Sequence, residues 1–226
     1  MPALLFDLDG TLADTNPDLH AAMNYVLAHH DCAPVPNTAI HNMIGGGARM
    51  ILQRGFAENG ITLPDDMLDA ATEEFVLWYD AHIDDNTRIF DNLLPVLQSA
   101  KKAGIPMAVV TNKREGLSAK LLFRLGLHGF FDTLVGGDTL PTRKPDPEPI
   151  EEALRRLGVA ASEAIMVGDS EADTGSAKAA NVASICVSFG YRRVSLEELE
   201  ADAIIDDYAE FAAAAKRLKP GLFDAL

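Results

Sequence analysis

Short apolar segments recur along the chain, and polar residues follow each of them. Segments of this kind, without polar alternation, are typical of strands buried on both faces, as in a parallel sheet. The predicted buried strands are residues 4–8, 107–110, 164–168 and 183–187, and shorter strands are predicted at 131–135 and 203–205.

Helical periodicity fills the intervals between these strands. Apolar residues recur there every three or four positions, and Gly104, Gly126 and Gly158 each follow such a segment, as expected where a helix ends. Because strands and helices alternate with short links, the sequence predicts an α/β fold with a doubly wound, Rossmann-like parallel sheet. The predicted helices of this part are residues 92–103, 115–125, 147–157, 171–180 and 208–218.

One long segment interrupts the alternation, because residues 14 to 82 show only helical patterns. Asn16, followed by a proline, predicts the N-cap of its first helix. We therefore expect an all-helical cap domain, residues 15–83, inserted into a core domain made of residues 1–14 and 84–226. The other helices predicted in the cap are residues 37–43, 48–58 and 65–82, with a glycine-rich break at 45–47.

Charge and cysteine content narrow the class of protein. The 226 residues include 34 acids against 19 bases, a formal charge of −15. Such a surface repels nucleic acid and anionic membranes, so we expect neither as a partner. No apolar run is long enough to cross a bilayer, and Cys32 and Cys186 form no disulfide framework. We expect a cytoplasmic protein, with monomer and homodimer both open.

Acidic residues stand at the ends of two predicted strands. Asp7 ends the first apolar run, Asp9 follows two residues later, and Asp169 follows the strand at 164–168. The carboxyl ends of parallel strands meet at one edge of the sheet, near the point where strand order reverses. We therefore expect these carboxylates to converge, and close like charges need a cation between them. Oxygen ligands of this kind suit Mg²⁺.

Other polar residues are expected beside these acids. Thr111 and Asn112 follow the strand at 107–110, Lys144 lies in a proline-rich loop, and Asp173 stands one helical turn after Asp169. A lysine and a hydroxyl group next to a metal ion suit the binding of a phosphoryl group. The set therefore predicts a small phosphorylated metabolite as the ligand.

Four of these motifs resemble those of the haloacid dehalogenase-like hydrolases and occur in the order of that family. With its two acids, the first motif resembles that of the phosphatase and phosphomutase branch of this family. The helical cap and residues 136–147 resemble the branch that hydrolyses phosphoglycolate. The motifs are Asp7-Leu-Asp9-Gly10-Thr11, Thr111-Asn112, Lys144-Pro145 and Gly168-Asp169-Ser170-Glu-Ala-Asp173.

The resemblance implies roles for the two acids of the first motif. Asp7 would attack phosphorus and form an aspartyl-phosphate. The metal would be held by Asp7, Asp169 and the backbone carbonyl of Asp9. The Asp9 carboxyl group would protonate the leaving oxygen and later take the proton of water.

The resemblance implies supporting roles for the other motif residues. Thr111 and Asn112 would hold phosphoryl oxygens, and Gly10 would let the chain turn beneath the phosphate. Lys144 would neutralise the developing charge, and Asp173 would orient Lys144 or a metal-bound water. Thr111 and Asn112 also suit a helix N-cap, and Asp173 suits the first turn of a helix.

Residues of the cap and of the loop after the second motif stay ambiguous. Arg49, beside the glycine-rich break, suits either a substrate carboxylate or the solvent. Lys113 and Arg114 either add positive potential at the site or face solvent. Trp78 and Tyr79 fit the core of the cap better than a substrate platform.

The sequence thus predicts a Mg²⁺-dependent phosphomonoester phosphatase with 2-phosphoglycolate as the leading substrate. A phosphatase for a sugar phosphate or an amino-sugar acid phosphate is the alternative within that class. A phosphomutase, or a non-catalytic binding protein on the same fold, are further alternatives.

Overall fold

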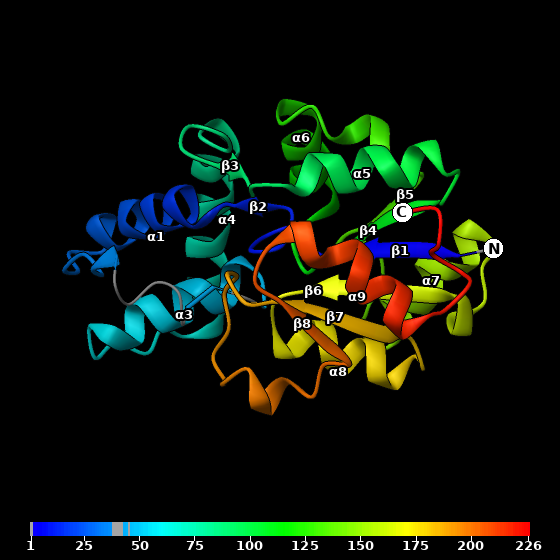
Figure 1. Ribbon diagram of the computed structural model, residues 1–226. Coiled ribbons are helices and arrows are strands. Elements are labelled where there is room, and N and C mark those ends of the chain that lie inside the picture. The colour runs from blue at the N-terminus through cyan, green and yellow to red at the C-terminus, as the bar shows by residue number, and fades with distance from the viewer. Residues whose placement is uncertain (1, 38–42, 45) are drawn as a thin grey trace.

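Six strands form one sheet in the computed structural model, which describes residues 2–37, 43–44 and 46–226 (Figure 1). They are β1 (Ala3–Phe6), β4 (Met107–Val110), β5 (Thr133–Val135), β6 (Ala164–Gly168), β7 (Ala183–Val187) and β8 (Ala203–Ile205). Their order is β5-β4-β1-β6-β7-β8, and every neighbouring pair is parallel. The predicted doubly wound α/β fold is confirmed, with β1 at the point where the strand order reverses.

The two faces of the sheet have separate cores, which β1 divides by simple alternation. Leu4 and Phe6 pack in one core with α5 (Leu93–Lys102), α6 (Glu115–Arg124) and α9 (Phe211–Leu218). Ala3 and Leu5 pack in the other core with α7 (Glu148–Leu157) and α8 (Glu171–Ala179). All four strand residues are fully buried, so the first strand has no solvent-facing side.

Among the described residues, three helices lie between the first strand and the rest of the sheet in sequence. They are α1 (Asn16–His29), α3 (Ala48–Glu58) and α4 (Asp65–Ala81), and they form a group beside the sheet in Figure 1. The helix predicted at residues 37–43 lies mostly outside the described residues. The domain boundaries at 14–15 and 83–84 stay a prediction. None of the described helices has both the length and the apolar character needed to cross a membrane.

The chain leaves and re-enters the sheet layer through two short strands that the sequence did not predict. β2 (Ala13–Asp14) and β3 (Arg88–Ile89) pair in antiparallel fashion. Beside them, the buried carboxylate of Asp18 accepts hydrogen bonds from the backbone N–H groups of Asn86 and Thr87, at 3.0 and 2.8 Å. The outgoing and returning segments are therefore fixed to each other.

Several boundaries differ from the sequence predictions, including the start of the last helix, where a 3₁₀ turn, Tyr208–Glu210, precedes α9. β1 ends at Phe6 and not at residue 8, because the chain turns at Gly10, whose φ is +82°. Thr15, and not Asn16, occupies the N-cap position of α1. β5 begins at Thr133 and not at residue 131, because a 3₁₀ turn, His128–Phe130, precedes it.

Candidate active site

Asp7 follows the last residue of β1 and is held there by the sheet. Its backbone N–H donates to the carbonyl of Val167 in β6 at 2.9 Å, which continues the parallel ladder by one residue. The side chain is largely buried, and Lys144 Nζ lies 2.9 Å from its Oδ1. Burial raises the pKa of Asp7 to about 6, and the charge of Lys144 opposes this rise. The carboxylate is therefore poorly compensated by its protein surroundings.

Asp169 occupies the corresponding place after β6. The hydroxyl group of Thr11 donates to its Oδ1 at 3.3 Å, and the backbone N–H of Tyr191 donates to its Oδ2. Burial, and then the charges of Asp173 and Asp7, raise its pKa well above the ordinary value. Two carboxylates therefore share a dry region at the ends of adjacent strands.

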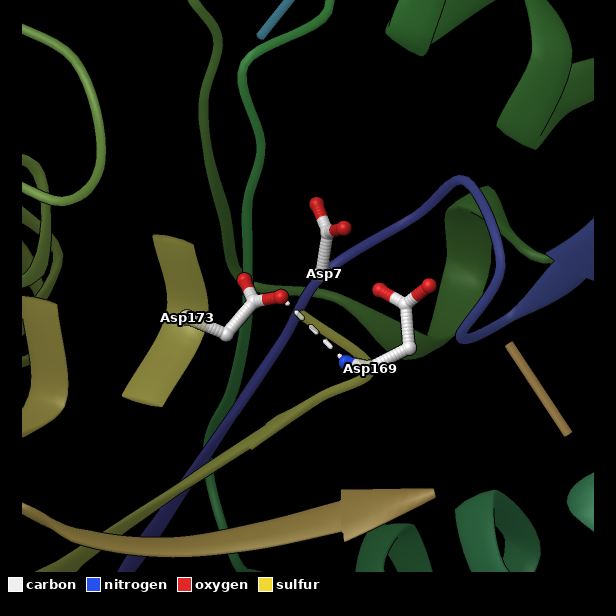
Figure 2. A group of neighbouring side chains, drawn as sticks. All are labelled: Asp7, Asp169 and Asp173. Atoms are coloured by element: carbon white, nitrogen blue, oxygen red, sulfur yellow. Dashed lines mark hydrogen bonds between the residues drawn. The ribbon is translucent and has the colours of Figure 1, made fainter. Parts of the chain in front are cut away.

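Asp173 on α8 completes a group of three acids, which Figure 2 shows together with Asp7 and Asp169. One oxygen of each lies within 4.8 Å of the others. Asp173 already accepts from Lys144 Nζ at 2.6 Å and from the hydroxyl and N–H groups of Ser170, at 2.7 and 3.1 Å. Its acceptor capacity is thus taken up by the protein, which suits a residue that positions Lys144.

Lys144 is buried, and its ammonium group lies at the ends of β1 and β4, beside α8. It donates to the carbonyl of Val110 at 2.6 Å and contacts Asp7 and Asp173. Burial by itself would lower its pKa, but the two carboxylates outweigh burial and raise the pKa above the ordinary value. Lys144 therefore stays charged and can face an incoming anion.

Thr111 and Asn112 follow β4 and have different partners. Thr111 is buried, and its backbone N–H donates to the carbonyl of Val135 at 2.9 Å. The side-chain amide of Asn112 donates to the carbonyl of Lys144 at 2.9 Å and accepts from its N–H at 3.0 Å. Asn112 therefore fixes the lysine loop with its side chain. The predicted contact of Asn112 with phosphate would therefore have to come from its backbone, and this contact stays a prediction.

Gly10 and Gly190 let the backbone approach Asp169 closely. A Cβ atom on Gly10 would lie 2.3 Å from Asp169 Oδ2, and one on Gly190 would lie 2.2 Å from Asp169 Cβ. Neither position accepts a side chain without moving Asp169. Gly10 thus shapes the turn beneath the acids, and its predicted contact with phosphate stays a prediction.

Asp9 lies close to the carboxylate group but has a different partner. Lys113 Nζ donates to its Oδ1 at 2.8 Å and to its Oδ2 at 3.1 Å. The same ammonium donates to the hydroxyl oxygen of Tyr79 on α4 at 2.8 Å. A chain of three polar side chains therefore joins the first motif, the loop after β4 and the helical insert.

A cavity of about 540 Å³ opens over these residues, between the sheet edge and the inserted helices. Its lining from the sheet side includes Asp7, Asp9, Thr111, Lys144 and Asp169. Its lining from the insert includes Gly46, Gly47, Arg49, Thr72, Phe75 and Tyr79.

Arg49 reaches the cavity but is already engaged. Its guanidinium donates to Asp69 Oδ1 at 2.8 Å and to Asp65 Oδ1 at 2.6 Å, and its side chain is 38% exposed. Its assignment to substrate selection stays a prediction, and these two acids would compete with an anionic substrate for it.

The inserted helices also contact the core through ion pairs along α6. Arg114 pairs with Glu73, Lys120 with Asp80 at 2.8 Å, and Arg124 with Asp84 at 3.0 Å. The cations belong to α6 or to the residue before it, and the acids belong to α4 or to the turn after it. Complementary charges thus join α4 and the turn after it to α6, and of these pairs only Arg114–Glu73 lines the cavity.

Comparison with known proteins agrees with the motif order and the sheet topology. Residues 4–187 match the family model described as haloacid dehalogenase-like hydrolase. The chain belongs to this family. Proteins named phosphoglycolate phosphatase from Agrobacterium fabrum and Rhodospirillum rubrum are 39% and 41% identical to it. The alignments cover 100% and 92% of this chain, and 94% and 88% of the relatives.

A solved structure extends the likeness to three dimensions. The crystal structure of a predicted phosphoglycolate phosphatase from Haemophilus somnus superposes with a TM-score of 0.89 at 27% identity. The superposition covers 95% of this hydrolase and 98% of the other chain. Together, the family match and the full-length relatives make the protein an enzyme, a phosphoric monoester hydrolase.

The structure of this hydrolase brings two further residues to the site. Lys113 is buried at the cavity, a position that the sequence left undecided between site and solvent. Tyr79 is fully buried, as expected for the core of the insert, yet its hydroxyl group faces Lys113. The signal for Lys113 was its place two residues after Thr111. Nothing in the helical pattern around Tyr79 marks its contact with the core.

Proposed function

We propose that this phosphatase hydrolyses 2-phosphoglycolate to glycolate and phosphate with Mg²⁺ as cofactor. The observation that carries the proposal is the buried Asp7 carboxylate, which faces the cavity with Lys144 2.9 Å away. A nucleophile is needed on one side of the phosphorus and a cation beside it, and this pair supplies both. The full-length relatives named phosphoglycolate phosphatase support the choice of substrate.

The donor set fits a magnesium ion. Asp7 and Asp169 offer carboxylate oxygens. Burial raises the pKa of both carboxyl groups, and the single positive charge of Lys144 does not offset this rise. Mg²⁺ prefers such hard oxygen ligands and keeps part of its water shell. Asp7, Asp169 and the backbone carbonyl of Asp9 would hold it. When bound, it supplies positive charge that lets an anionic nucleophile approach an anionic phosphate.

The residues of the chain divide the reaction into two displacements. In the first, a carboxylate oxygen of Asp7 forms a bond to phosphorus, the bond from phosphorus to the ester oxygen breaks, and the carboxyl group of Asp9 gives its proton to that oxygen. In the second, water attacks phosphorus, Asp9 takes its proton, and the carboxylate of Asp7 is released. Lys144 and the Thr111 hydroxyl group hold the phosphoryl oxygens.

A second candidate substrate class follows from the size of the cavity. Phosphoglycolate is a small molecule, and about 540 Å³ leaves room for a larger leaving group. A sugar phosphate or an amino-sugar acid phosphate is therefore the alternative. A panel of kcat/KM values over phosphoglycolate, sugar phosphates and an amino-sugar acid phosphate separates the two, with phosphoglycolate expected to give the highest value.

The catalytic proposal is tested with a generic aryl phosphate and with phosphoglycolate. Turnover is expected with Mg²⁺ and should be lost when EDTA removes the metal. Asp7→Asn should abolish turnover and keep the circular dichroism spectrum, whereas the exposed control Asp91→Asn should leave both unchanged. Metal-independent turnover, or activity of Asp7→Asn, would contradict the assignment.

A further inference from the structure

Lys113 is the cation of the cavity with the least usual setting. Its side chain is only 5% exposed, and its ammonium contacts one carboxylate, Asp9, and one neutral hydroxyl group, that of Tyr79. The Tyr79 ring also packs beneath it, with Nζ 4.4 Å from the ring centroid. Burial of a lysine ammonium costs free energy unless it has partners. Here the core supplies one partner, Asp9, and the helical insert supplies the other, Tyr79. None of the steps derived above for phosphoryl transfer uses this lysine.

The length of the proposed substrate restricts where its carboxylate can lie. In phosphoglycolate the carboxylate carbon is two covalent bonds from the ester oxygen. Asp9 must reach that ester oxygen to protonate it. The substrate carboxylate must therefore lie beside Asp9, and Lys113 Nζ is 2.8 Å from Asp9 Oδ1.

The charge of the site calls for a cation at that place. The carboxylates of Asp7 and Asp169 already lie beside the reacting group, and both would repel an added carboxylate. Lys144 is occupied by Asp7 and Asp173. Lys113 has an ammonium with three donors, so it can bind Asp9 and a second carboxylate together.

The other cations that line the cavity are less suited to this role. Arg49 donates to two acids, Arg114 pairs with Glu73, and both guanidinium side chains are more than a third exposed. Arg143 is exposed and donates through Nε to the carbonyl of Gly137 at 2.7 Å. A buried ammonium beside the leaving group therefore selects for the anion more strongly than a solvated guanidinium at the rim.

We propose that Lys113, held in place by Tyr79, binds the carboxylate of the substrate. This inference rests on the proposed function, because it assumes a substrate with a carboxylate next to the phosphoester. It assigns substrate selection to a core residue that a tyrosine of the insert supports. Substrates without the carboxylate would leave the Lys113–Asp9 pair unchanged and gain nothing from it.

The test compares phosphoglycolate with 2-hydroxyethyl phosphate, which has a similar length but no carboxylate. For Lys113→Met we expect kcat/KM on phosphoglycolate to fall about 100-fold, mainly through KM, as when one partner of a buried charge pair is removed. On 2-hydroxyethyl phosphate the fall should be much smaller, because this substrate has no carboxylate that would lose its partner. Lys113→Arg should keep part of the preference. Tyr79→Phe, which keeps the ring, should raise KM for phosphoglycolate about 5-fold.

Lys120→Met is the matched control, because Lys120 joins α6 to α4 through Asp80 but does not line the cavity. The Lys120→Met variant should have the same kcat/KM as the wild type on both substrates. Equal losses on the two substrates in Lys113→Met would make Lys113 a positioning residue for Asp9 and overturn the inference. Loss of the preference in Arg143→Met and not in Lys113→Met would also overturn it, with the proposed function intact. A wild-type enzyme without preference for phosphoglycolate would overturn both.

Variants that fold poorly are covered by a binding measurement. In the Asp7→Asn background, calorimetry should show that phosphoglycolate binds more tightly than 2-hydroxyethyl phosphate, and Lys113→Arg should reduce this difference less than Lys113→Met. Circular dichroism of each variant reports folding. An undiminished difference in a folded Lys113→Met variant contradicts the assignment.

Discussion

Asp18 and Thr87 join the two segments through which the chain enters and leaves the helical insert. Both the backbone N–H and the hydroxyl group of Thr87 donate to Asp18 Oδ2 at 2.8 Å, and the carboxylate is 1% exposed. Residues 69 positions apart are thus fixed within hydrogen-bond distance. This contact fixes the start of α1 to the returning segment.

Removal of this carboxylate should destabilise the protein. Asp18→Ala would leave the buried Thr87 N–H without its acceptor and its hydroxyl group with only the Ile83 carbonyl at 3.4 Å, so the free energy of unfolding should fall by about 2–4 kcal/mol. Urea denaturation measures the change. The exposed control Asp91→Asn, on the returning segment, should have no effect. An Asp18→Ala protein as stable as the wild type would mean that these donors find other partners.

The approach of Gly190 to Asp169 gives a second prediction. Gly190→Ala would place a methyl group 2.2 Å from Asp169 Cβ, so Asp169 must move. We expect the apparent affinity for activating Mg²⁺ to fall about 10-fold or more, as for other changes that disturb the orientation of a ligand. The matched control is Gly116→Ala on α6, where a Cβ meets no atom within 4 Å. Unchanged metal activation in Gly190→Ala would show that Asp169 is not held as described.

Ion pairing along α6 predicts a salt-sensitive contribution to stability. Arg124→Glu should lower the free energy of unfolding by about 0.5–1 kcal/mol, because a partly exposed pair becomes a repulsive one. The double reversal Arg124→Glu/Asp84→Arg should restore most of it. In about 1 M salt, where screening extends over about 3 Å, the difference should largely vanish. A loss of stability that salt does not change would indicate that altered packing, and not charge repulsion, causes it.

The two cysteines should differ in reactivity. Burial raises the pKa of the Cys186 thiol to about 12, so at about pH 8 it stays protonated, and the thiolate is the reactive form. Cys32 is partly exposed. Iodoacetamide should therefore label Cys32 in the native protein and label both cysteines after unfolding, as measured by peptide mass spectrometry. Rapid native labelling of Cys186 would show that β7 opens locally.

The sequence predicted the sheet and the strand-end residues because both follow from local patterns. Buried parallel strands are continuous apolar runs, and the residues after them share one edge of the sheet. Asp7, Thr111 and Asp169 are therefore found from the residues alone. β2 and β3 have two residues each, which is too short to produce a periodic signal.

Contacts between the insert and the core could not be predicted in the same way. The contact between Tyr79 and Lys113 depends on how the inserted helices pack over the sheet edge. A helical pattern in the sequence indicates only which face of α4 is apolar. The prediction that Asn16 is the N-cap of α1 was wrong for a similar reason. Asn16 N–H donates to the Asp14 carboxylate at 3.2 Å and to the Tyr191 hydroxyl oxygen at 2.9 Å, so one of its partners is a residue far away in the sequence.

The central position of β1 has a consequence for synthesis of the protein. Leu4 in this strand pairs with Met107 on one side and with Ile165 on the other. β1 is translated before both of these neighbours, and β6 follows it by about 160 residues. Until then β1 is an apolar segment with an unpaired edge, the kind of surface that chaperones bind and that aggregates. The growing chain must therefore keep β1 from aggregating until β6 has been made.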